Sequence, residues 1–164
     1  MTDLETPRLV LHPMTPADAE HVAAGSPPTG ARWAPGYPSP GERGAAARYL
    51  ATCADTGDPS PFCSYGIRLR TDGLVVGGIG FHGPPDDRGS VTVGYGLVES
   101  ARGRGYASEA LRALLRFARE RGVARVCGDA DTGNIPSQRV MTAAGMRLVG
   151  EDASLKYYQV EWAA

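Results

Sequence analysis

The 164-residue sequence predicts a mixed α+β fold, with an antiparallel meander of strands flanked by helices. Two strand-like runs, residues 62–69 and 74–81, are separated by a turn containing the Asp72-Gly73 step, which is a strong hairpin signal. Residues 91–98 form a third strand-like run. Apolar residues at helical spacing over residues 106–121 indicate an amphipathic helix. The length suits a single domain spanning residues 1–164.

The amino-terminal part predicts a strand followed by a helix. Residues 8–11 read as a short apolar strand. Thr15 has the character of a helix N-cap, with Pro16 at the first helical position and Asp18 in the first turn, where its charge complements the helix dipole. We therefore expect a helix that runs to about Gly25.

A proline-rich loop follows at residues 26–41, which hold five of the thirteen prolines. Proline lacks the N–H donor that helices and inner strands need, so this segment is predicted to be irregular. Its aromatic residues, Trp33 and Tyr37, have two interpretations: they contact a bound substrate, or they pack on the body of the protein. An alanine-rich helix is expected over residues 42–53.

Residues 78–83 match the pattern G-x-G-x-x-G and follow a strand, as a dinucleotide-binding fingerprint does. That fingerprint also needs a helix to open at its last glycine. Pro84 and Pro85 follow instead, so a dinucleotide site is not predicted. His82 is interpreted as a residue at the end of a strand, because no second ligand stands at metal-binding spacing.

Residues 102–107 join the third strand to the amphipathic helix and predict an anion site. Unpaired backbone N–H groups and the positive end of the helix dipole meet at this point. Gly103 and Gly105 let the backbone approach a phosphate closely, while Arg102 and Arg104 add positive charge. The alternative interpretation is a tight turn with incidental arginines.

The composition disfavours several classes of protein. There are 17 basic and 18 acidic residues, a net charge of −1, so we expect neither a nucleic-acid nor a membrane partner. No apolar run approaches the ~20 residues that span a bilayer, and residues 1–5 do not resemble a signal peptide, which predicts a cytoplasmic protein. Cys53, Cys63 and Cys127 are predicted to be buried free thiols, with no disulfide and no metal site.

Arg102-x-x-Gly105-x-Ala107 matches the [Q/R]-x-x-G-x-[G/A] pyrophosphate-binding motif of the GCN5-related N-acetyltransferases (GNAT). The match continues on both sides of the motif, over residues 94–97 and 108–111. Residues 134–146 and 5–11 resemble segments of the ribosomal-protein N-terminal acetyltransferase-like branch of this superfamily. These matches occur in the family's order and span most of the chain.

The resemblance implies a GNAT-like fold: a central, mostly antiparallel twisted sheet in which the strand at residues 94–98 bulges and splays from its neighbour to admit pantetheine. Acetyl-CoA is then the co-substrate and no metal is needed. In this interpretation the backbone of Leu97 and Val98 pairs with pantetheine, and N–H groups of residues 103–108 hold the pyrophosphate. The implied acetyl-CoA contacts are Leu97, Val98, Arg102, Gly103, Arg104, Gly105, Tyr106, Ala107, Ser108 and Asn134.

Acetyl transfer to an amine needs a neutral nucleophile, donors for an oxyanion and a proton for the departing thiolate. Many relatives donate that proton from a tyrosine seven positions after the motif asparagine, where this chain has Met141. Ser137, one helical turn earlier, is the candidate to hold the sulfur or relay a proton. Asn134 is a candidate to bind pantetheine or Ser137, or to act only as a helix N-cap.

The resemblance implies an N-acetyltransferase that moves an acetyl group to a primary amine, either a protein N-terminus or a small molecule, by direct transfer through a tetrahedral intermediate. The acceptor is expected between the loop carrying Trp33 and Tyr37, the hairpin strands and a strand at residues 156–162. The oligomer is expected to be a monomer or homodimer. Alternatives are a catalytically inactive acyl-CoA-binding or sensing module and a nucleotide-binding regulator. The general base is left open among Asp129, Asp131, Glu99 and His82.

Overall fold

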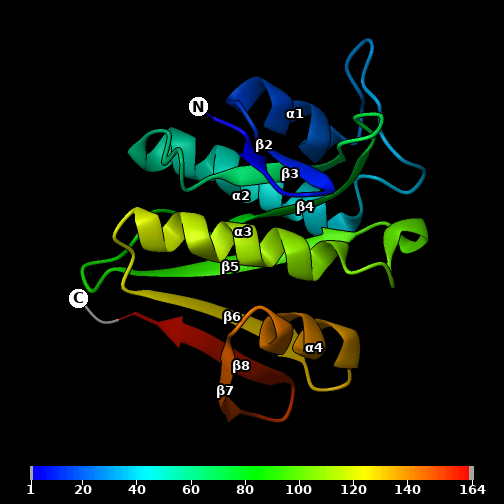
Figure 1. Ribbon diagram of the computed structural model, residues 1–164. Helices are drawn as coiled ribbons and strands as arrows, with labels where there is room; N and C mark the ends of the chain where they lie inside the picture. The colour runs from blue at the N-terminus through cyan, green and yellow to red at the C-terminus, as the bar shows by residue number, and fades with distance from the viewer. Residues whose placement is uncertain (1, 163–164) are drawn as a thin grey trace.

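The computed structural model describes residues 2–162; residues 1, 163 and 164, at the ends of the predicted domain 1–164, lie outside that range. Within it the chain forms an eight-stranded sheet in the order β1-β2-β3-β4-β5-β6-β8-β7. Neighbouring strands are antiparallel except for β5 and β6, which are parallel. The expected mixed αβ architecture with a mostly antiparallel sheet is confirmed (Figure 1).

The bounds of the elements are as follows. The strands are β1 (Leu4–Glu5), β2 (Leu9–Pro13), β3 (Ser64–Leu69), β4 (Val75–Phe81), β5 (Ser90–Leu97), β6 (Arg125–Asp131), β7 (Arg147–Glu151) and β8 (Leu155–Glu161). The helices are α1 (Pro16–Ala24), α2 (Pro40–Thr56), α3 (Tyr106–Glu120) and α4 (Ile135–Ala143), with a 3-10 turn η1 (Glu99–Ala101) before α3.

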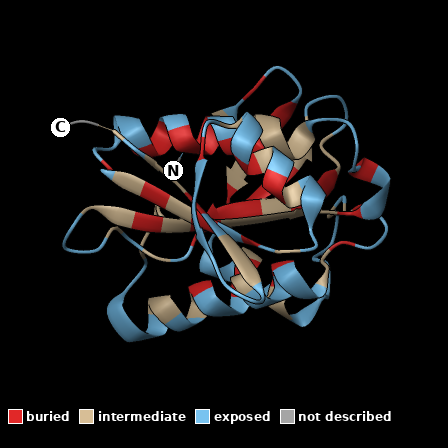
Figure 2. Ribbon diagram, turned by 90° about the horizontal axis from the view of Figure 1, so that it is seen from below, coloured by how far each residue is buried: buried red, intermediate tan, exposed pale blue. Residues whose placement is uncertain are grey.

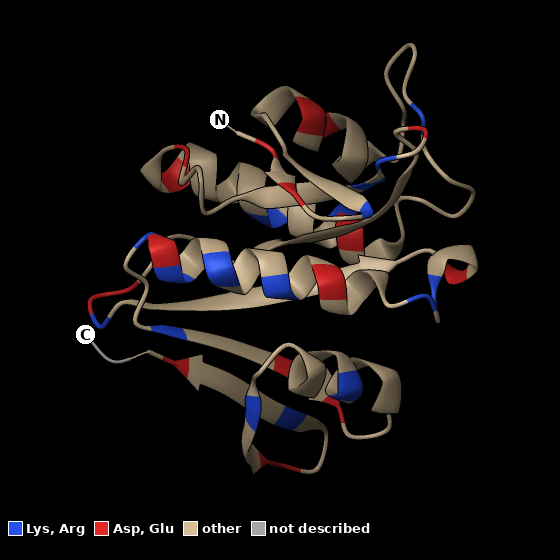
Figure 3. Cartoon of the chain, in the orientation of Figure 1, with Lys and Arg blue, Asp and Glu red and all other residues tan. Residues whose placement is uncertain are grey.

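The helices lie on both faces of the sheet. In Figure 1, α3 and α4 lie in front of the strands, whereas α2 lies behind β3 and β4 with α1 packed on it. Buried residues run along the strands and the sheet-facing sides of the helices (Figure 2). On α3, Leu111 and Leu114 are fully buried, while Arg positions recur along the helix face that Figure 3 shows toward the viewer. The amphipathic pattern over residues 106–121 therefore identified this helix correctly.

The proline-rich loop is shorter than expected. We predicted irregular chain over residues 26–41 and a helix over residues 42–53, but α2 already begins at Pro40 and continues to Thr56. The reason is that proline suits the first helical position, where its missing N–H has no intrahelical partner in any case.

The strands β5 and β6 separate soon after they meet. Their parallel pairing covers only residues 90–92 of β5 and 125–127 of β6. Beyond that point β6 stays paired with β8, and the two ribbons diverge toward α4 (Figure 1). The expected splay is therefore confirmed. The expected bulge in β5 is wrong, because its register against β4 runs without a shift from Phe81↔Val93 to Gly77↔Leu97.

The three cysteines are free thiols, but only Cys63 is fully buried, with Cys53 and Cys127 half-buried. Between residues 2 and 162, no helix has the length and apolar character needed to cross a membrane. Over the same range, no group of three or more His, Cys, Asp or Glu side chains is arranged to hold a metal ion.

The tight approach of β4 and β5 generates a stability prediction. A Cβ at Gly77 would lie 2.1 Å from the carbonyl oxygen of Gly96, which is backbone and cannot move without distorting the ladder. We expect Gly77→Ala to destabilise the fold by about 2 kcal/mol or more, lowering the melting temperature by about 4–8 °C. Gly44→Ala is the control, since Gly44 lies in α2 with open space at its Cβ position. That change should stabilise by about 0.5–1 kcal/mol, and equal melting temperatures for the two variants would contradict the packing argument.

Candidate active site

The loop before α3 has the conformation of an open helix N-terminus. Gly103 and Gly105 adopt φ angles of +77° and +81°, in the left-handed region that favours glycine. Gly105 is the N-cap of α3, and no side chain caps the helix there. The first N–H groups of a helix have no intrahelical acceptor, so those of α3 remain open to an anion.

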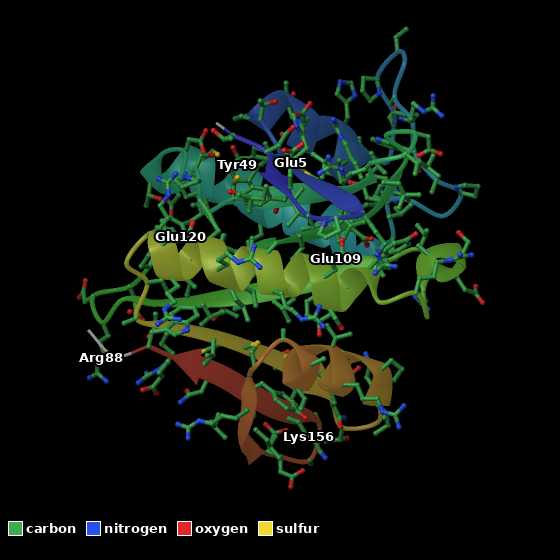
Figure 4. The ribbon with its side chains drawn as sticks, viewed as in Figure 1. Glu5, Tyr49, Arg88, Glu109, Glu120 and Lys156 are labelled. Carbon is green, nitrogen blue, oxygen red and sulfur yellow. The ribbon has the colours of Figure 1, made fainter. Side chains whose placement is uncertain are left out.

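A charged latch holds this loop from the amino-terminal segment. Arg8 Nη1 donates to the carbonyl oxygen of Arg104 at 2.7 Å, and Arg8 Nε forms an ion pair with Glu109 Oε1 at 2.8 Å. The same guanidinium lies 4.6 Å from the centre of the Tyr106 ring. Thr6 Oγ1 and the Arg8 N–H both donate to Glu109 Oε2, at 2.5 and 2.9 Å. Figure 4 shows Glu109 near the start of α3, beside β1 and β2.

Burial alone would raise the pKa of Glu109, but the hydrogen bonds from Thr6 and Arg8 hold it below its ordinary value. Glu109 therefore stays ionised and paired at neutral pH. The segment carrying Thr6 and Arg8 thus fixes the loop that precedes α3, although the two lie about a hundred positions apart in the chain.

The backbone of β5 offers alternate N–H groups to the gap left by β6. The N–H of Val98 donates to the carbonyl oxygen of Val76 at 2.8 Å, so it belongs to the ladder with β4. Because strand N–H groups alternate in direction, those of Tyr95 and Leu97 point to the other side, toward the gap. The carbonyl oxygen of Leu97 accepts from Arg102 Nε at 3.2 Å. The expected pairing of the Val98 N–H with pantetheine is therefore not available in this structure.

A pair of hydroxyl groups crosses the gap between β5 and α4. The Tyr95 hydroxyl lies 2.8 Å from Ser137 Oγ and also donates to the carbonyl oxygen of Ser137 at 3.0 Å. Asn134 caps α4, its Oδ1 accepting from the Ser137 N–H at 3.2 Å. Burial raises the pKa of Tyr95, with the hydrogen bond to Ser137 acting in the opposite direction, so the phenol stays protonated at neutral pH. Sequence reasoning singled out Ser137 and Asn134 but not Tyr95, whose partner is 42 positions away.

Met141, at the position of the family's tyrosine, is only 1% exposed and belongs to the core. A Cβ at Gly128 of β6 would lie 3.1 Å from its sulfur. The Met141 side chain therefore fills space between α4 and the sheet. The hydroxyl groups that could donate a proton in place of a tyrosine at this position belong to Tyr95 and Ser137.

On the opposite face of the sheet, α2 covers a cavity of about 320 Å³ above β4 and β5. Its floor is made of glycines that face each other across the two strands, Gly78 opposite Gly96 and Gly80 opposite Gly94. The G-x-G-x-x-G match at residues 78–83 thus reflects a bare patch of sheet. Phe81 ends β4 and the next element is the strand β5, so the helix that a dinucleotide fingerprint requires does not open at Gly83.

Glu42 lies over this floor and was not singled out from the sequence. Its side chain is 7% exposed, and within residues 2–162 its Oε1 has no hydrogen-bond partner. Burial raises the pKa of Glu42, opposed by amides of the first turn of α2 and by the Arg102 guanidinium. Ser39-x-x-Glu42 has the spacing of a capping box, which is the ordinary explanation for such a glutamate, but the Ser39 side chain makes no capping hydrogen bond.

The predicted substrate residues Trp33 and Tyr37 lie elsewhere. Their rings meet edge to face at 5.3 Å and line a second cavity of about 420 Å³, on the side of α1. Tyr37 is only 8% exposed, and the Ala34 N–H donates to the carbonyl oxygen of Val75, which ties the loop to β4. The structure therefore favours the packing interpretation and does not bring these aromatics, or β8, to the cavity of Glu42.

Of the four residues considered as a general base, His82 lines the Glu42 cavity, and Asp129, Asp131 and Glu99 are not among its lining residues in the described chain. Partial loss of hydration lowers the pKa of His82, and the Arg48 guanidinium acts in the same direction, opposed by Asp129. His82 is thus a neutral imidazole at neutral pH.

A sheet that opens between β5 and β6, next to a glycine-rich helix N-terminus, is the architecture of a GNAT acyltransferase. The Acetyltransferase (GNAT) domain family matches residues 8–147, and the chain belongs to this family.

Similar proteins agree with this assignment. YjdG of Bacillus subtilis (strain 168), described as an uncharacterized N-acetyltransferase, is 33% identical over 98 residues, which are 59% of this chain and 58% of that relative. An acetyltransferase structure from Agrobacterium tumefaciens str. C58 has 25% identity and a TM-score of 0.68, covering 99% of this chain and 95% of that one. Ribosomal-protein-S5-alanine acetyltransferase from Vibrio fischeri has 15% identity and a TM-score of 0.72, covering 98% and 97%, and shows the likeness of fold.

The latch generates a prediction for Glu109→Gln. Because the pKa of this group is lower in the folded chain than its unfolded value of about 4.3, its stabilising effect is present above that pH and is lost as the pH falls through the folded-state pKa. We expect a loss of about 1–3 kcal/mol at pH 7, shrinking below about pH 4, together with weaker acetyl-CoA binding. Urea unfolding at several pH values and calorimetry measure these effects.

Glu120→Gln is the matched control, since Glu120 is exposed at the other end of α3 (Figure 4). A Glu109→Gln variant that unfolds and binds acetyl-CoA like the Glu120→Gln variant would show that the latch does not hold the loop.

Proposed function

We propose that this protein is an acetyl-CoA-dependent N-acetyltransferase that acetylates a primary amine, on a peptide N-terminus or a small molecule, by direct transfer through a tetrahedral intermediate. The observation that carries the proposal is the gap between β5 and β6. The gap lies beside the glycine-rich loop before α3, whose conformation suits a phosphate group. On one side of β5 the gap meets the Tyr95 and Ser137 hydroxyls, and the other face of the sheet carries the Glu42 cavity.

The loop before α3 suits the pyrophosphate of acetyl-CoA. Its glycine conformations and uncapped helix N-terminus direct N–H groups outward, and the exposed Arg104 adds charge. The residues proposed to hold the pyrophosphate are Arg102, Gly103, Arg104, Gly105, Tyr106, Ala107 and Ser108. The N–H groups of Tyr95 and Leu97 point toward the gap and would pair with pantetheine or hold the oxyanion.

In the proposed reaction the amine nitrogen forms a bond to the acetyl carbon as the carbon–sulfur bond breaks. The thiolate that departs takes a proton from the Ser137 hydroxyl, which Tyr95 replaces through the 2.8 Å contact between them. This arrangement takes the place of the tyrosine that relatives carry at the Met141 position. Asn134 supports it by fixing the first turn of α4.

We further propose that the protein lies in the ribosomal-protein N-terminal acetyltransferase-like branch. The segments at residues 5–11 and 134–146 support this placement, and the structure gives both a physical role: the first forms the latch through Arg8, and the second carries the cap of α4 and Ser137.

The direct test is CoA release from acetyl-CoA in the presence of a mixed panel of peptides and small amines. Turnover of an amine, with the acetylated product seen by mass spectrometry, supports the enzyme. Tight acetyl-CoA binding with no turnover of any amine would support an acyl-CoA-binding module instead.

Reversing a charge in the loop before α3 should weaken the binding of acetyl-CoA. We expect Arg104→Glu to raise the KM for acetyl-CoA tenfold or more, about 1.4 kcal/mol, because it sets a negative charge against the phosphates. Arg116→Glu, an exposed arginine farther along α3, is the control. Steady-state kinetics that are the same in both variants would contradict the phosphate assignment.

The hydroxyl pair should act as a unit. We expect Tyr95→Phe and Ser137→Ala each to lower kcat by about 10²-fold while the KM for acetyl-CoA stays close to normal, because general acid catalysis contributes on this scale. The double variant should be little worse than the poorer single variant, as groups in one relay are not additive. Tyr157→Phe, at an exposed tyrosine of β8, is the control. An unchanged kcat in both single variants would remove the pair from the mechanism.

A further inference from the structure

The Glu42 cavity holds a buried carboxylate with one oxygen, Oε1, that has no hydrogen-bond partner within residues 2–162. Glu42 is 7% exposed, and the backbone amides of Ser39 and Glu42 and the Arg102 charge compensate only part of the cost of burying its charge, because Oε1 stays without a partner in the described chain. It lines the cavity, and Oε1 lies 3.6 Å from where a Cβ at Gly96 would stand. A ligand that carries a positive charge or a hydrogen-bond donor could supply the partner that Glu42 Oε1 lacks.

The floor under Glu42 leaves room for such a ligand. A Cβ at Gly78 would lie 3.2 Å from Glu42 Cγ, and a Cβ at Gly94 would lie 2.8 Å from His82 Nε2. Side chains at these positions would fill the space over the sheet. Gly96 also lies between Tyr95 and Leu97, whose N–H groups face the gap, so the carboxylate is close to the part of β5 where transfer is proposed.

The other end of the cavity carries the opposite charge. Ala45 and Arg48 follow Glu42 along the same lining face of α2, three and six positions later. At 1.5 Å rise per residue, Glu42 and Arg48 stand about 9 Å apart along the helix axis. Arg48 makes no ion pair with the described residues, and the neutral ring of His82 lines the cavity beside it.

We propose that this cavity binds a primary amine that also carries an anionic group a few bonds away, with the ammonium at Glu42 and the anion at Arg48 and His82. The inference rests on the proposed acetyl transfer and names the acceptor class of that site. A free amino acid and a peptide N-terminus with an acidic side chain on its second residue share this chemistry. An amine with a second positive charge is disfavoured, because that charge would meet the Arg48 guanidinium.

In this proposal Glu42 also accepts the first of the three protons on the ammonium nitrogen. The ammonium transfers one proton to the Glu42 carboxylate, which gives a neutral amine and a neutral carboxyl group. A second proton leaves the nitrogen as its bond to the acetyl carbon forms, and it restores the proton that the hydroxyl pair delivers to the thiolate. The third stays on the amide. Glu42 then releases its proton to solvent, so one proton is set free for each acetyl group transferred.

The test is a set of amines of equal length with different ends: 4-aminobutyrate, butylamine and 1,4-diaminobutane. We expect kcat/KM to be at least tenfold higher for 4-aminobutyrate than for butylamine, and lowest for 1,4-diaminobutane. Peptides beginning Ala-Asp and Ala-Asn form a second arm. A preference for Ala-Asp that exceeds the preference for 4-aminobutyrate identifies a protein N-terminus as the source, and the reverse identifies a free amino acid.

Variants separate the two ends of the cavity. Glu42→Gln should lower kcat at least 100-fold on every amine while acetyl-CoA binding and the melting temperature stay intact. Arg48→Ala should abolish the preference for 4-aminobutyrate over butylamine, whereas Arg116→Ala, at an exposed position of α3, should keep it.

The inference is overturned if Arg48→Ala retains the preference, if 1,4-diaminobutane is the best acceptor, or if Glu42→Gln keeps its kcat. In each of these cases acetyl-CoA turnover by the wild-type protein still supports the proposed function. Failure of the wild-type protein to turn over any amine, peptide or small molecule, defeats both.

Discussion

The site depends on one constraint: β5 has a lasting partner on only one side. Its parallel pairing with β6 ends after Thr92, while its antiparallel ladder with β4 continues to Leu97. Backbone groups on the unpaired side must find other partners, because N–H and C=O groups are costly to leave unsatisfied away from water. Arg102 supplies one by bonding the Leu97 carbonyl, and the Tyr95 hydroxyl bridges to α4. The unpaired half of a strand thus becomes a binding surface held between two rigid layers.

The two faces of the sheet at β5 carry different chemical groups. On the side of α3 and α4 lie hydroxyl groups that stay protonated, and on the side of α2 lies a carboxylate over a floor of glycines. In the proposed reaction, a thioester in the gap would meet a proton donor from one face and an amine from the other. One oxygen of Glu42 stays buried without a partner in the described chain, a local departure from full hydrogen bonding of the kind that folds carry at functional sites.

The sequence predicted those parts of the protein whose structure is determined by neighbouring residues in the chain. The hairpin at Asp72-Gly73, the helix α3 and the loop at Gly103 and Gly105 follow from turn chemistry, apolar period and the need for positive φ. It did not find Glu42 or Tyr95, because each owes its role to a neighbour distant in the chain. A glutamate in the first turn of a helix has an ordinary capping explanation, and only its burial over the sheet sets Glu42 apart. The bulge in β5 was implied by the family resemblance and supported only by the glycines on either side of Tyr95, which instead pair in register with glycines of β4.

The latch through Arg8 has a consequence for how the protein is made. Glu109 and the loop before α3 are tied to a segment that leaves the ribosome about a hundred residues earlier, and β2, after pairing with the adjacent β1, waits for β3 some fifty residues later. Contacts of such long sequence separation form late, because loop closure must precede them. The loop before α3 therefore gains its contact with Arg8 only once the amino-terminal segment is in place. If this loop binds CoA as proposed, capture of CoA by a nascent chain would report that this contact has formed.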